Sequence, residues 1–171
     1  MNAHTVNICS YQSPCGELLL GENYGRLCLC DWKSIKHRGR NDNRIMRFLN
    51  AEYVERKSDV LVRAAKELDE YFAGMRKEFD IPLLFAGTEF QRSVWNALYG
   101  IPYGETRSYM EIARQVGNPK GVRAVAQAVG ANAISILVPC HRVIGSDFSL
   151  TGFAGGLETK RFLLELEKSM P

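Results

Sequence analysis

The chain has 171 residues, of which 46% are hydrophobic and 24% are charged. These proportions are typical of a globular protein with one domain or two small lobes, and they exclude a disordered chain or a fibre. The formal net charge of +3 is too small to indicate nucleic-acid binding by itself. The sequence shows no apolar run long enough for a membrane span and no secretory signal, so we expect neither a membrane partner nor export.

The sequence contains five cysteines. An odd number of cysteines in a mid-sized chain without an export signal does not indicate a disulfide framework, so we expect thiols in a reducing cytoplasm. Cys28 and Cys30 lie one residue apart on a predicted strand and share one of its faces. Two such cysteines supply only half of a tetrahedral site, and we therefore predict no bound metal.

The first half of the sequence predicts a small sheet flanked by helices. Apolar runs between turn-forming residues predict three short strands, at 6–11, 18–20 and 27–29. A polar, basic stretch over 33–47 predicts a loop that runs into a helix. Ser58 is a typical N-cap for a second helix that extends to about Ala73, and Gly74 is expected to end it. The stretch 80–87 predicts the join to the second half.

The second half of the sequence is predominantly helical. Two capping boxes are expected to open helices, namely Thr88 with Gln91 and Ser108 with Glu111. Gly117 is expected to end the second of these helices. Asn118 is then expected to cap a third helix to about Val129, with Pro119 at its first position. The last helix is predicted over 158–168.

Two helices joined by a four-residue turn between Ser108 and Val129 have the spacing of a helix-turn-helix, although such pairs are also common packing units. The stretch 112–142 lacks Asp and Glu and carries four basic residues, Arg114, Lys120, Arg123 and Arg142. This local charge is typical of a surface that contacts phosphates. The second helix is rich in Ala and Val, which read few bases in the major groove. We therefore expect minor-groove contact with Arg123 inserted; the alternative is a solvated charge.

Cys140 stands in a different chemical setting from the other cysteines. It follows a strand-like run, 134–138, and a proline, and it precedes His141 and Arg142, two potential cations that favour a thiolate. With Asn132 nearby, these residues could form an activated nucleophile. In an extended chain His141 and Cys140 point in opposite directions, so a backbone turn or a water is needed to link them. The alternative for this thiol is a small buried hydrophobe.

The sequence around Cys140 is part of a longer series of short motifs. In chain order these are Phe90-Gln91, Val94-Trp95, Ile101-Pro102, Gly104-Glu105, Ser108-Tyr109, Gly117-Asn118-Pro119, Arg123-Ala124-Val125, Asn132, Pro139-Cys140-His141-Arg142-Val143, Gly152, Gly155-Gly156 and Lys160. Their order and spacing resemble those of the O6-alkylguanine-DNA alkyltransferases, a family of direct-reversal DNA repair proteins. The resemblance covers the chain from about Thr88 to Glu167. It is looser in the N-terminal half, through Ser13-Pro14 and Gly16.

The resemblance implies an α+β fold with two lobes. A small N-terminal sheet-plus-helix lobe, RNase H-like, is expected over 1–84 as structural support. A helical C-terminal lobe with a helix-turn-helix, winged-helix-like, is expected over 85–171 and would bind DNA and accept the alkyl group. The implied partner is double-stranded DNA containing alkylated guanine, no cofactor is implied, and we expect a monomer.

The resemblance also implies a mechanism, a single-turnover suicide repair of O6-methylguanine, with O4-methylthymine as an alternative substrate. Cys140 would attack the methyl carbon in one irreversible displacement, which leaves S-methylcysteine and restored guanine. His141 would act as the base through a water, and Glu167 would orient His141. Because the alkylated oxygen lies inside the base stack, the lesion must be flipped out. Tyr109 would help to rotate it, and Arg123 would fill the gap.

The resemblance assigns supporting roles to other residues. Asn132 would hold the active-site turn by hydrogen bonds, and the pocket would be lined by Val143 and by the backbone around Ala154 and Gly155. Helix stability does not explain Glu167, because the macrodipole disfavours an acid in the last turn of a helix. The remaining alternative for Glu167 is a solvated charge near the chain end.

Three other functions stay open at this point. A non-catalytic alkylguanine-binding relative would only flag damage, but such proteins typically lack the acceptor cysteine. A cysteine hydrolase would use Cys140 with His141, and it leaves the helix-turn-helix unexplained. A thiol-based redox regulator would have to read an operator sequence, which the Ala-rich helix disfavours.

Overall fold

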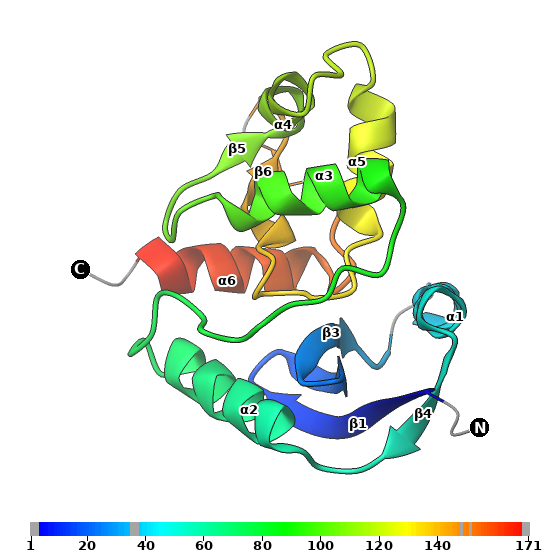
Figure 1. The fold of residues 1–171 in the computed structure, drawn as a ribbon. Coiled ribbons are helices and arrows are strands. Elements are labelled where there is room, and N and C mark those ends of the chain that lie inside the picture. Colours follow the sequence, from blue (N-terminus) through cyan, green and yellow to red (C-terminus); the bar gives the residue numbers. More distant parts are fainter. Residues whose placement is uncertain (1–3, 35–37, 148, 151, 169–171) are drawn as a thin grey trace. The chain divides into compact units, whose positions relative to one another are not determined.

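The computed structural model describes residues 4–34, 38–147, 149–150 and 152–168. The chain divides into two compact units, Met1–Gly87 and Thr88–Pro171, and each has its own helices, strands and buried apolar core (Figure 1). Within the described ranges, no helix is both long enough and apolar enough to cross a membrane.

The first unit is built on a four-stranded sheet. Strands β1 (His4–Ser13), β2 (Gly16–Asn23) and β3 (Arg26–Trp32) are antiparallel neighbours, and β4 (Ala51–Glu55) pairs parallel to β1, which gives the order β3-β2-β1-β4. The sequence predicts the first three strands, and each is longer than its apolar run. It does not predict β4, whose short edge strand lacks clear apolar alternation.

Two helices accompany this sheet, α1 (Arg38–Leu49) and α2 (Asp59–Phe72). The predicted N-cap of α2 is confirmed, because the Ser58 side chain accepts a hydrogen bond from the Leu61 N–H at 3.5 Å. Gly74 follows the helix with a φ of +76°, a conformation that favours glycine and ends the helix. The Tyr11 hydroxyl on β1 donates to Asp69 of α2 at 2.6 Å and fixes the helix on the sheet.

The second unit is mainly helical. In chain order its elements are α3 (Glu89–Tyr99), β5 (Arg107–Ser108), α4 (Tyr109–Gln115), α5 (Val122–Gly130), the 3₁₀ turn η1 (Cys140–Arg142), β6 (Val143–Ile144) and α6 (Leu157–Lys168). Both predicted capping boxes are confirmed, at the start of α3 and at the start of α4. The Trp95 indole N–H donates to the Ala128 carbonyl at 2.8 Å and ties α3 to α5.

The predicted start of α5 at Asn118 is wrong. The helix begins at Val122, and 118–121 form a separate turn in which the Gly121 N–H donates to the Asn118 carbonyl at 3.0 Å. Pro119 suits the second position of a turn as well as the first position of a helix, so its presence did not separate the two. A Cβ at Gly121 would meet the Asn118 side chain, which would have to move. The connection between α4 and α5 is therefore six residues long, 116–121, not four.

Candidate active site

The residues before Cys140 form a buried turn, so the predicted strand over 134–138 is wrong. Ile136 has a φ of +74°, and the Val138 N–H donates back to the Ile134 carbonyl at 3.0 Å. All five side chains of this run are buried. A short buried apolar run gives the same sequence pattern in a strand and in a buried turn, and here the tight turn is the structure adopted.

The side chain of Asn132 holds this turn. Its Nδ2 donates to the Val138 carbonyl at 2.9 Å, and its Oδ1 accepts from the Ile134 N–H at 3.0 Å. Asn132 is buried, so these bonds are shielded from water. One side chain thus pairs backbone groups at both ends of the turn that leads into Cys140.

Cys140 opens a 3₁₀ turn and is 8% exposed. Its N–H donates to the Val138 carbonyl at 2.8 Å, and the Arg142 N–H donates to the Pro139 carbonyl at 2.9 Å. In a 3₁₀ turn successive side chains differ by about 120° around the axis, not by the half-turn of an extended chain. The turn therefore supplies the backbone bend that neighbouring Cys140 and His141 require in order to act together.

A buried charged network follows Cys140. The Glu167 carboxylate lies 2.7 Å from His141 Nε2 and accepts two hydrogen bonds from the Arg142 guanidinium, at 2.8 and 2.9 Å. Arg142 Nη1 also donates to the Ile101 carbonyl at 2.7 Å. All three charged or titratable side chains are buried. Glu167 is therefore not a solvated charge. The basic stretch predicts a phosphate contact for Arg142, and this prediction is wrong, because the side chain is buried against Glu167.

The pKa shifts in this network define its protonation. Burial raises the pKa of Glu167, but hydrogen bonds from His141 and Arg142 outweigh it and bring the value to about 2. Burial lowers the pKa of His141 despite the hydrogen bond to Glu167. The imidazole is therefore neutral beside an ionised carboxylate, so Nε2 carries the proton and donates it to Glu167. Nδ1 is then an acceptor; it is buried and bonds to no described protein group.

Lys160 is a second buried cation in this region, on α6. Its Nζ donates to the Val143 carbonyl at 2.6 Å, directly after the 3₁₀ turn. Burial lowers the pKa of Lys160 to about 8, and the charge of Cys140 opposes this shift. The sequence motifs include Lys160 but assign it no role. The sequence signal that could have shown Lys160 to be buried is its spacing with Leu163 and Glu167 along one face of α6.

A short parallel pairing links the cysteine turn to the helix-turn-helix. β6 begins directly after the 3₁₀ turn, and its Val143 pairs with Arg107 of β5. Tyr109, half-buried, follows β5 as the first residue of α4. The pairing thus connects Tyr109 through the backbone to Cys140. Val143 itself is fully buried.

The other predicted site residues lie on loops and on the surface. Arg123 is exposed on the first turn of α5, next to the exposed Ala124. Ala154 is exposed and Gly155 half-buried in the segment before α6. The structure thus brings four predicted residues into one buried cluster, Asn132, Cys140, His141 and Glu167.

All five cysteines carry thiols. In the part of the chain that the structure describes, no group of three or more His, Cys, Asp or Glu side chains is arranged to hold a metal ion.

Fold and site together define a two-unit α+β protein in which a cysteine precedes a buried His–Glu pair. Residues 9–85 match the family model described as 6-O-methylguanine DNA methyltransferase, ribonuclease-like domain. Residues 89–169 match the corresponding DNA binding domain model. The chain belongs to the 6-O-methylguanine DNA methyltransferase family, and the predicted resemblance and α+β fold class are confirmed.

Individual relatives cover nearly the whole chain. A methylated-DNA–protein-cysteine methyltransferase of Methanosarcina barkeri is 45% identical over 158 residues, 92% of this chain and 94% of the relative. The constitutive enzyme of that name from Bacillus subtilis is 45% identical over 166 residues, 92% of each chain. The crystal structure of Mycobacterium tuberculosis OGT in complex with DNA has a TM-score of 0.81 at 42% identity, covering 95% of this chain and 93% of that one.

Proposed function

We propose that this chain repairs DNA by moving the methyl group of O6-methylguanine irreversibly to Cys140, once per molecule. The observation that carries the proposal is the buried network of His141, Glu167 and Arg142 directly after that cysteine. It leaves a neutral imidazole whose Nδ1 can accept a proton, next in sequence to a nucleophile. Membership of the family and the names of its relatives support the same chemistry.

The reaction balances without a cofactor. A water between His141 Nδ1 and Cys140 Sγ passes the thiol proton to the imidazole, and the ionised Glu167 stabilises the imidazolium. The thiolate then forms the S–C bond to the methyl carbon as the bond from that carbon to O6 breaks. Guanine leaves with the electron pair, and the proton taken from the thiol is available to it. The Lys160 ammonium favours the thiolate through its charge.

Access to O6 requires a flipped base, because this oxygen lies inside the duplex stack. We assign Arg123 to the gap that the flipped base leaves in the stack, which it enters from the minor groove, since it projects from an exposed helix face next to small Ala124. Tyr109 helps to rotate the lesion from the start of α4. Val143, Ala154 and Gly155 complete the pocket.

The proposed binding partner is double-stranded DNA containing alkylated guanine. Residues 85–171 bind it and accept the alkyl group, and residues 1–84 support them. The protein acts as a monomer in the cytoplasm, which agrees with cysteines that carry thiols.

Analysis of the DNA tests the proposed function. The purified chain is mixed with excess duplex carrying one O6-methylguanine, and the nucleosides are quantified after digestion. We expect the methylated nucleoside to fall by one equivalent per chain, with an equal gain of deoxyguanosine and no further change. Unchanged nucleosides with lesion-selective binding would instead indicate a damage sensor, and continued conversion would contradict single turnover. A duplex with O4-methylthymine tests the alternative substrate.

Removal of the Arg123 side chain tests the flipping step. We expect Arg123→Ala to slow methyl transfer from duplex DNA by about 10- to 100-fold, because the emptied stack is no longer filled. Its reaction with iodoacetamide should match that of the unchanged chain, since the thiol is untouched. Arg161→Ala, an exposed arginine of α6, is the matched control. An unchanged transfer rate in Arg123→Ala would refute the minor-groove assignment.

A further inference from the structure

One helix that the proposed function does not use is strongly basic. Helix α1 has four arginines and one aspartate in 12 residues, Arg38, Arg40, Arg44, Arg47 and Asp42. Its net charge of +3 equals the formal net charge of the whole chain, 22 basic against 19 acidic residues. The rest of the sequence is neutral in sum, because the basic stretch 112–142 is balanced by acidic residues elsewhere. Helix α1 is thus a strongly basic element of the first unit.

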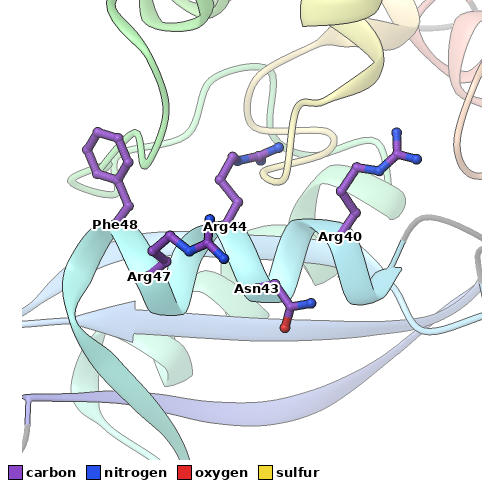
Figure 2. A pocket seen from close by; sticks show the side chains of 5 residues that line it. All are labelled: Arg40, Asn43, Arg44, Arg47 and Phe48. Atoms are coloured by element: carbon purple, nitrogen blue, oxygen red, sulfur yellow. The ribbon is translucent and has the colours of Figure 1, made fainter.

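One face of α1 forms a groove. Five residues line a cavity of about 550 Å³, namely Arg40, Asn43, Arg44, Arg47 and Phe48 (Figure 2). Their spacing of three or four residues places them along the same side of a helix. Figure 2 shows Arg40, Arg44 and Phe48 extending in the same direction from the helix. We call this lining the α1 groove.

The arginines of α1 differ in their partners. Arg38 lies outside the groove and is paired with Asp42 at 2.9 Å, which neutralises both. Arg44 is held in place, because its Nε donates to the Ala86 carbonyl at 3.1 Å and its Nη1 donates to Asn41 at 3.2 Å. The charge of Asp31 also acts on the Arg44 guanidinium. The α1 groove itself contains no acidic residue.

Arg40 and Arg47 are the exposed charges of the α1 groove. Neither side chain has a hydrogen bond or ion pair with any residue that the structure describes. They are seven residues apart, so about 10 Å of helix axis separates them, which is about three base-pair steps of a duplex. Phe48, 53% exposed, adds an apolar surface at the end of the groove. Arginine forks match the geometry of phosphate oxygens, whereas the apolar ring suits a sugar face.

We propose that the α1 groove is a second DNA-binding surface, which holds the phosphodiester backbone of a duplex without reading its sequence or its damage. The choice of DNA rests on the proposed function, which brings the chain to duplexes. Arg40 and Arg47 each contact one phosphate, the fixed guanidinium of Arg44 adds positive charge between them, and Phe48 packs against the sugar. The surface raises the affinity for undamaged DNA, along which the protein has to search for a lesion.

The salt dependence of binding to undamaged DNA tests this proposal. Affinity for an unmodified duplex of about 20 base pairs is measured from about 50 to about 200 mM salt. Replacing both exposed arginines, Arg40→Gln with Arg47→Gln, should reduce the slope of log K against log salt by about 1.8, since two phosphate contacts are lost. Arg47→Gln alone should reduce it by about 0.9. The matched control, Arg56→Gln with Lys66→Gln, removes two exposed charges of the same unit outside the groove.

A slope that is unchanged, or that falls equally in the control, would overturn the proposal, because the first outcome shows no phosphate contact and the second a general charge effect. After an unchanged slope, an acidic protein surface would be the remaining binding partner for the α1 groove. The proposed function fails separately, if the unchanged chain binds DNA but takes no methyl group. The slope comparison needs no lesion and is still valid in that case.

Discussion

Alanine in place of Cys140 should abolish methyl transfer and leave binding to a duplex with O6-methylguanine intact. The sulfur is the only group that the substitution removes, and no other residue of the buried cluster can form a stable thioether. The bonds that shape the turn come from the backbone and from Asn132, so Cys140→Ala should keep the local structure. Transfer is measured with a radiolabelled methyl group, and affinity is measured on the same duplex.

Cys15→Ala is the matched control for Cys140→Ala. Cys15 is half-buried, and burial raises the pKa of its thiol, so it is not a competing nucleophile. The control should take up one methyl group per chain. Transfer in Cys140→Ala at the rate of the unchanged chain would rule out this acceptor. Loss of lesion binding in the same variant would show that the thiol also holds the complex together.

Glutamine in place of Glu167 should lower the rate of methyl transfer by about 100-fold or more, the usual scale of a lost general base. The amide carries no charge, so it cannot stabilise the imidazolium of His141, and it leaves the Arg142 guanidinium buried without a counter-charge. The rate is measured under single-turnover conditions. Glu165→Gln, on the same helix but exposed, is the matched control and should react normally. A fully active Glu167→Gln would refute the relay.

The lowered pKa of Glu167 predicts a pH dependence of stability that Glu167→Gln should lack. The pKa of Glu167 is about 2 in the folded chain, against an ordinary value of 4.5. A lowered pKa stabilises the fold above the unfolded-state value, and this contribution is lost as pH falls from about 4.5 to about 2. The loss is about 3 kcal/mol. The free energy of unfolding, measured in urea, should therefore fall over this pH range more for the unchanged chain than for Glu167→Gln. Parallel curves for the two proteins would contradict the assignment.

Local signals in the sequence predicted much of the fold. Capping boxes at Thr88 and Ser108 depend on residues three positions apart, so they can be found without tertiary structure. Where a sequence pattern fits two local structures, the sequence alone did not decide between them. Pro119 fits both a helix start and a turn, and the apolar run 134–138 fits both a strand and the buried turn that Asn132 holds.

The candidate site depended on long-range contacts that sequence patterns do not contain. The resemblance predicted that Glu167 orients His141. It gave no indication that Arg142, 25 residues away in the chain, shares the same carboxylate. The basic stretch instead predicts a phosphate contact for Arg142, because a charge in the sequence does not reveal whether its side chain is buried. The contact of Lys160 with the turn was not predicted either. The sequence signal for it was a charged residue on the buried face of a helix.

The mass of the intact protein after reaction tests the central claim most directly. The chain is mixed with a duplex carrying one O6-methylguanine, and the modified residue is located by peptide mapping. Our account predicts the gain of one methyl group per chain, on Cys140, with no further increase when more DNA is added. An unchanged mass, or a methyl group on any other residue, would contradict it.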